Sequence, residues 1–153
     1  RAAGDRAVDA SIEERLAEHV PPAAALAFFG NNLSVSIATA YAGVALSVPA
    51  ALSVWFNGAL LGAVARLEVA PPALAAFVAP HGLFEIPALV VSGALGLHLG
   101  HAFWRTWQGG AGRTYLADEL ERAFWVLVGV GLLLAVAALI EGFVSPYYWR
   151  PFV

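Results

Sequence analysis

The chain has 153 residues, of which 60% are hydrophobic and 12% are charged, whereas soluble domains are about 45–50% apolar and about 25% charged. This composition excludes an ordinary soluble domain and indicates an integral membrane protein. The formal net charge is -3, with no cluster of basic residues, which argues against nucleic acid as a partner. The absence of cysteine excludes disulfides, thiolate metal ligands and cysteine nucleophiles.

The first segment, residues 1–22, alternates charged and apolar residues at a rough helical period and ends at Pro21-Pro22. A periodic, charged segment of this kind is typical of a solvated amphipathic helix, and consecutive prolines favour its termination. We expect a short juxtamembrane helix here.

The membrane domain is expected over residues 23–146, followed by an interfacial tail over residues 147–153. Since one span needs about 20 apolar residues, the uncharged stretch before Arg66 is long enough for two spans, with a break near Pro49. We place four spanning helices at the following ranges: 25–46, 51–65, 81–103 and 123–140. Residues 69–79 are apolar but too short to cross, so they predict an interfacial or re-entrant helix lying against protein. The predicted fold is therefore all-α, a polytopic transmembrane helix bundle.

Glycines on two of the predicted helices indicate close packing. Gly93, Gly96 and Gly100 lie on the third span, and Gly58 and Gly62 on the second. Small residues at this spacing allow helices to approach closely in a membrane. We expect these surfaces to serve packing within the bundle and self-association, with a dimer as the expected homo-oligomer.

Four spans place both chain ends on one side of the membrane. The arginines expected on that side are Arg1, Arg6, Arg15, Arg66 and Arg150, and those on the other are Arg105, Arg113 and Arg122. By the positive-inside rule, this distribution favours cytoplasmic termini in a multi-pass protein of the cell membrane.

A polar cluster is predicted where the second, third and fourth spans meet one face of the bilayer. His81 and Glu85 share a helix face because they are four residues apart, and Glu141 ends the fourth span at the same level. Ionisable groups at such a depth cost roughly 2.5–3.5 kcal/mol each unless they are paired. The full set predicted for the cluster is Asn31, Asn32, Asn57, His81, Glu85 and Glu141.

Two other histidines, His98 and His101, are expected to lie outside this cluster. They follow His81 by about 25–30 Å along a continuous helix, which places them at the opposite face of the bilayer. We interpret them as interfacial histidines near Trp104.

Three interpretations of His81, Glu85 and Glu141 follow from the residue types, in order of preference. The first is a structural knot of hydrogen bonds that fixes the bundle. The second is a divalent metal site, zinc being the expected ion, because imidazole and carboxylates are zinc ligands and a four-residue spacing suits a helix. The third is a catalytic or transport site, in a metal-dependent hydrolase or a small transporter. No nucleophile motif, phosphate-binding loop or HExxH pair is present, so no catalytic residue is assigned and a non-enzymatic role is favoured.

Four motifs, in order along the chain, resemble the stage II sporulation protein M family of polytopic membrane proteins. These are FFGNN (28–32), NGALLG (57–62), PHGLFEIPA (80–88) and LIEGFVSP (139–146). The third is the most specific. The resemblance covers nearly the whole membrane region.

The resemblance implies a scaffold more than an activity. Family members in spore-forming bacteria hold two peptidoglycan-degrading partners at the membrane during engulfment, and relatives occur in organisms that form no spores. From the composition and the glycine surfaces we expect lipid and a second copy of the chain as partners, and the resemblance implies other membrane or cell-envelope proteins. Apart from a divalent metal, no cofactor is expected.

Overall fold

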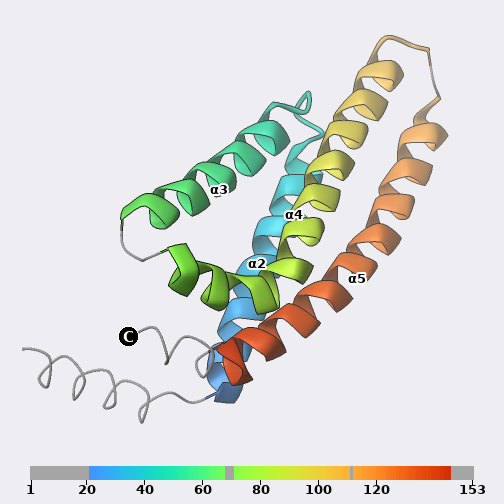
Figure 1. Cartoon of the computed structure of the whole chain (residues 1–153). Helices are drawn as coiled ribbons and strands as arrows, with labels where there is room; N and C mark the ends of the chain where they lie inside the picture. Colours follow the sequence, from blue (N-terminus) through green and yellow to red (C-terminus); the bar gives the residue numbers. More distant parts are fainter. Residues whose placement is uncertain (1–20, 68–70, 111, 146–153) are drawn as a thin grey trace, which may run out of the picture.

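The computed structural model describes residues 21–67, 71–110 and 112–145. Four helices follow one another along the chain: α2 (Pro21–Ala42), α3 (Val48–Leu67), α4 (Pro71–Trp107) and α5 (Arg113–Phe143) (Figure 1). Among these residues there is no strand, so the predicted all-α fold is confirmed. The predicted juxtamembrane helix up to residue 20 and the interfacial tail at 147–153 lie outside the described residues.

Within the described residues, three helices are long and apolar enough to cross a membrane: Pro22–Ala42, Ala79–Trp107 and Thr114–Phe143. The predicted second span falls on α3, whose apolar part, Val48–Ala63, is shorter than the helices of spanning length. Successive helices alternate in direction, so the described chain begins and ends at the same end of the bundle (Figure 1). The protein is a multi-pass, helical membrane protein.

The predicted separate helix at 69–79 is instead part of α4, which runs without a break from Pro71 and contains Pro80 and Pro87. A proline inside a helix removes one hydrogen bond and clashes with the preceding turn, which bends the helix without necessarily ending it. The first turns of α4 accordingly lie at a steep angle to the rest (Figure 1).

A close backbone approach joins the end of α2 and the start of α3 to α4. Leu46 and Ser47 have φ values of 57° and 66° and reverse the chain. A Cβ atom at Gly96 would lie 2.5 Å from Cβ of Ala50 and 2.6 Å from the carbonyl oxygen of Thr39. Only glycine fits this crossing, so the predicted packing role of Gly96 is a property of the monomer.

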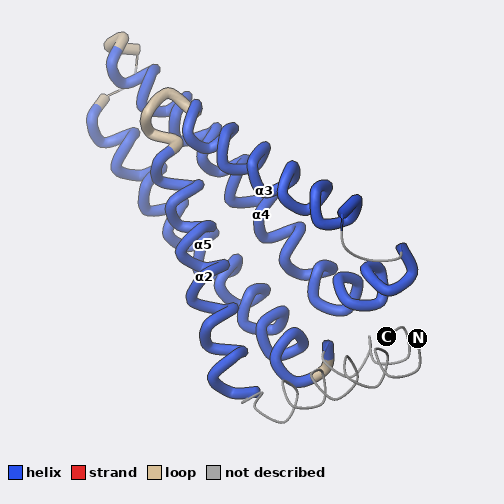
Figure 2. The backbone as a smooth tube through the Cα atoms, turned by 90° about the vertical axis from the view of Figure 1, so that its left-hand side faces the viewer, coloured by secondary structure: helices blue, strands red, loops and turns tan. Residues whose placement is uncertain are grey.

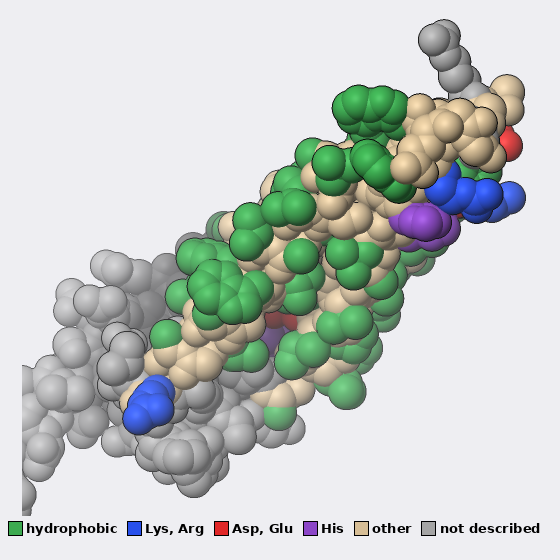
Figure 3. Space-filling model, turned by 90° about the horizontal axis from the view of Figure 1, so that it is seen from above, with side chains coloured by type: hydrophobic (Ala, Val, Ile, Leu, Met, Phe, Trp, Pro, Cys, Tyr) green, Lys and Arg blue, Asp and Glu red, His purple; other side chains and the backbone are tan. Residues whose placement is uncertain are grey.

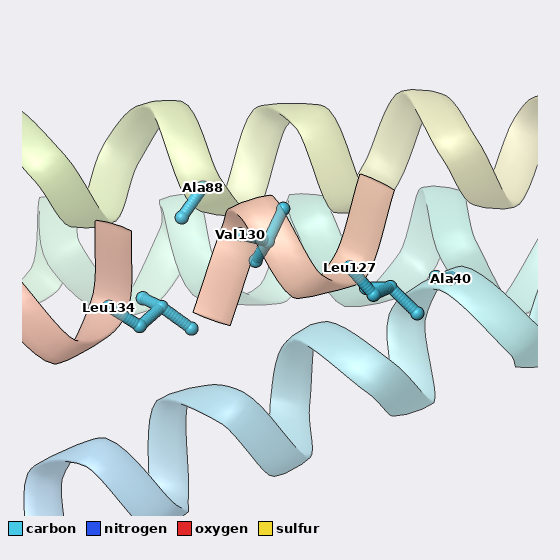
Figure 4. Close-up of a cluster of buried hydrophobic side chains, with 5 residues drawn as sticks. All are labelled: Ala40, Ala88, Leu127, Val130 and Leu134. Carbon is cyan, nitrogen blue, oxygen red and sulfur yellow. The ribbon is translucent and has the colours of Figure 1, made fainter. Parts of the chain in front are cut away.

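The core lies between α2, α4 and α5. Leu127, Val130 and Leu134 of α5 point between Ala88 of α4 and Ala40 of α2 (Figure 4). Because two of these five side chains are alanine, the helices can pack closely. α3 packs against α4 and α2 at the edge of this three-helix unit (Figure 2).

Large apolar side chains on the outer surface of α3 are strongly exposed. Trp55 and Phe56 are 69% and 62% exposed. In a membrane protein such surfaces contact lipid, which is as apolar as the side chains themselves.

Candidate metal-binding site

Three ionisable side chains from two helices meet at one end of the bundle. His81 and Glu85 come from α4 and Glu141 from α5, and one donor atom of each lies within 4.8 Å of the others. They meet because α4 and α5 are antiparallel: His81 lies just inside the start of the span Ala79–Trp107, and Glu141 just inside the end of Thr114–Phe143. The group therefore lies at one edge of the membrane-spanning region.

The imidazole of His81 is held from the end of α5. Its side chain is 5% exposed, and its Nδ1 lies 3.1 Å from Oγ of Ser145, with which it hydrogen-bonds. Metal-ligating histidines generally have their second ring nitrogen fixed by such a partner. The bond from Ser145 is a contact of this kind.

Glu85 connects the group to α2. Asn32 donates a hydrogen bond from Nδ2 to Oε1 of Glu85. Asn31 is exposed and donates to Oδ1 of Asn32 at 3.2 Å. Asn32 therefore contacts the predicted cluster directly, and Asn31 reaches it only through Asn32.

Asn57 lies nearby on α3 but does not join the three donor groups. Its Nδ2 donates to the carbonyl oxygen of Ser53 at 2.8 Å, within α3. It lines a pocket of about 170 Å³ together with Asn32 and Glu85. Asn57 thus faces the same space as Glu85 from another helix.

The donor set fits zinc. Zinc binds imidazole nitrogen at about 2.0–2.1 Å and carboxylate oxygen at about 2.0–2.2 Å in a tetrahedron, which places two ligand atoms about 3.4 Å apart. The donor atoms here lie within 4.8 Å of one another, so side-chain rotations that bring the most distant pair about 1.4 Å closer would complete this geometry. Magnesium and calcium prefer oxygen ligands alone, and His81 therefore favours zinc.

The charges in this group also favour a cation. Where side chains are described, the ion pairs involve neither Glu85 nor Glu141, since both are formed by Glu119. Two carboxylates that are partly withdrawn from water need compensation. One divalent ion would balance both.

A second polar cluster, missed in the sequence analysis, lies at the other end of the bundle. Glu119 has a side chain only 7% exposed, and it accepts hydrogen bonds at 3.0 Å from His98 and from Arg122. Figure 3 shows histidine beside arginine side chains at this end. The sequence predicted an interfacial position for His98, but the prediction did not include a contact with Glu119.

A signal for the pair was present in the sequence. His98 and Glu119 lie about equally far on either side of the turn near Gly109, and residues so placed pair across an antiparallel helical hairpin. His101 is exposed and lines a shallow pocket with Trp104, as an interfacial histidine would.

The fold and this site define a class: a helical, multi-pass membrane protein with an acid–imidazole group at one edge of its spans. Residues 2–146 match the family model described as stage II sporulation protein M. The match covers most of the chain, and the protein therefore belongs to this family, as the sequence motifs indicated. No protein of curated function and no solved structure matches the chain significantly.

Proposed function

We propose that this family member is a non-enzymatic membrane scaffold in which His81, Glu85 and Glu141 bind one divalent metal ion, zinc fitting best. The observation that carries the proposal is the approach of these three donors, from two helices, to within 4.8 Å of one another. A bound ion would link α4 to α5 at the membrane edge. Through the hydrogen bond from Asn32 to Glu85, it would also fix α2.

Such an ion would stabilise the folded bundle. Metal sites that form only in the folded state add their binding free energy to folding. A site that joins the ends of two long helices can therefore hold a rigid surface for other proteins. The competing interpretation is a knot held by hydrogen bonds alone, which the contacts of Ser145 and Asn32 also support.

Partners of the scaffold follow from its surface and its family. A Cβ atom added at Gly58 or Gly62 of α3 would meet nothing within 4 Å, so this small-residue surface of α3 is open to a second copy of the chain. We expect a dimer, and cell-envelope proteins as further partners. The arginine distribution favours the cytoplasmic membrane with cytoplasmic termini.

Metal analysis of the purified protein in detergent tests the proposal. After zinc loading and removal of free ion, wild-type protein should hold about one zinc per chain. His81→Ala, Glu85→Gln and Glu141→Gln should each lose it. His101→Ala and Glu121→Gln replace exposed residues of the same types and should keep it. If wild-type protein holds no stoichiometric metal, the metal site is contradicted and the hydrogen-bonded knot remains as the interpretation.

A second candidate function rests on the pocket beside Glu85. A membrane-embedded metal-dependent hydrolase or a small transporter needs space for a substrate next to His81, Glu85 and Glu141, and the pocket provides such space at Glu85. The scaffold is preferred because the sequence contains no nucleophile or phosphate-binding motif.

A further inference from the structure

The pocket beside the donor group is built from all four helices. α2 provides Asn32, Val35 and Ser36, α3 provides Asn57 and Leu61, α4 provides Glu85, Ile86 and Leu89, and α5 provides Leu134. Its volume of about 170 Å³ is enough for a molecule of about six heavy atoms, at roughly 30 Å³ per water-sized group. Glu85 belongs both to this pocket and to the donor group.

Polar and apolar side chains share the lining of the pocket. The polar ones are two asparagine amides, one serine hydroxyl and the Glu85 carboxylate, and the other five are aliphatic. A lining of this kind binds a small molecule that has a hydrogen-bonding head and a short apolar tail.

A zinc ion held by three protein ligands retains a fourth position. Catalytic zinc sites have this arrangement, with the fourth position taken by water or substrate, whereas structural sites are closed by four protein ligands. The donor group supplies three residues, His81, Glu85 and Glu141. One of them, Glu85, also lines the pocket, which lies on the side of α2 and α3.

The charge of the group selects a neutral ligand. The two positive charges of the ion are balanced by the carboxylates of Glu85 and Glu141. An anion would therefore add uncompensated charge at the membrane edge, which is costly. A neutral carbonyl oxygen adds none, and the amides of Asn32 and Asn57 are suited to hydrogen-bonding an amide head group.

We propose that the pocket admits a small, neutral amide or ester with a short apolar tail, whose carbonyl oxygen takes the fourth position of the metal. This proposal rests on the metal site proposed above. It assigns to that site an exchangeable ligand and the chemical class of that ligand.

Cobalt-loaded protein provides the test, because the visible absorption of cobalt(II) changes with its coordination. Butyramide is the neutral probe, and butyrate is the anionic comparison of nearly the same size. We expect a saturable spectral change with butyramide in wild-type protein and a much weaker change with butyrate. In Leu61→Trp, which fills the pocket from α3, the response to butyramide should be lost while cobalt remains bound.

Leu60→Trp is the matched control, since Leu60 is the preceding residue of α3, is 54% exposed and does not line the pocket. It should respond as wild type does. If Leu61→Trp fails to bind cobalt, Asn57→Ala replaces it, and its butyramide response should be weakened.

The outcomes separate the two proposals. Cobalt bound with no response to butyramide, with an equal response to butyrate, or with the same butyramide response in the pocket variant overturns the ligand proposal and leaves the metal site standing. Failure of wild-type protein to bind cobalt overturns both.

Discussion

Nδ1 of His81 and Oγ of Ser145 lie 3.1 Å apart and hydrogen-bond, although 64 positions separate the two residues in the chain. Ser145 is fully buried. The bond fixes the orientation of the His81 ring from the end of α5. It thereby links the two helices that supply the donor group.

Loss of this bond should weaken metal binding. Ser145→Ala leaves the three donors in place but removes the group that orients the imidazole, and substitutions of this kind typically cost about 10–100-fold in metal affinity. Ser145→Thr keeps the hydroxyl and should bind more tightly than Ser145→Ala. Competition with a zinc-binding dye measures the affinities. Equal affinity in wild type and Ser145→Ala would contradict the orienting role.

Asn32 should support the site, whereas its neighbour Asn31 should not. Asn32→Ala removes the donor to Oε1 of Glu85 and frees that carboxylate to move, so zinc affinity should fall by about tenfold or more. Asn31 is exposed, and exposed substitutions are usually within about 0.5 kcal/mol of neutral. Both variants can be measured with the same dye. Similar losses from the two substitutions would show that the hydrogen bond from Asn32 has no specific role.

The second cluster should contribute to stability without affecting metal. Glu119→Gln weakens the contacts to His98 and Arg122, so the thermal unfolding midpoint in detergent should decrease. Zinc content should not change, because Glu119 and Glu141 are about 33 Å apart along α5 at 1.5 Å per residue. Loss of zinc from folded Glu119→Gln protein would mean that the two clusters are coupled.

Two glycine substitutions should have opposite effects. An alanine at Gly96 would place Cβ 2.5 Å from Cβ of Ala50, and overpacking typically costs about 1–3 kcal/mol. An alanine at Gly129, which has open space around it, should stabilise the helix by up to about 1 kcal/mol. Denaturant titration in detergent measures both. Equal stability of the two variants would contradict the close approach of α2 and α3 to α4 at Gly96.

Much of this fold could be predicted from the sequence because uncharged stretches of spanning length have few alternatives in a membrane. Whether the apolar segment at residues 69–79 forms a separate helix could not be predicted in this way. Prolines at 71, 72 and 80 indicate helix boundaries locally, yet only contacts with the other helices decide whether Pro80 ends α4 or bends it. Pro49 marked the region of the first reversal, but the turn itself precedes it at residues 43–47.

The approach of Glu141 to His81 and Glu85 could be predicted because the direction of each span fixes which ends meet. The partner of Glu119 could not be predicted by the same reasoning applied to helix ends alone. The burial of Glu119 against His98 depends on the rotation of α5 about its own axis. The contact from Ser145 likewise depends on how far α5 continues past Glu141.

Anomalous diffraction at the zinc edge from crystals of the zinc-loaded protein tests the central claim most directly. We expect one peak per chain, with a ring nitrogen of His81 and a carboxylate oxygen from each of Glu85 and Glu141 within about 2.0–2.2 Å of it. An absent peak at this position in zinc-loaded crystals, or carboxylates of Glu85 and Glu141 that lie too far apart to share one ion, would contradict it.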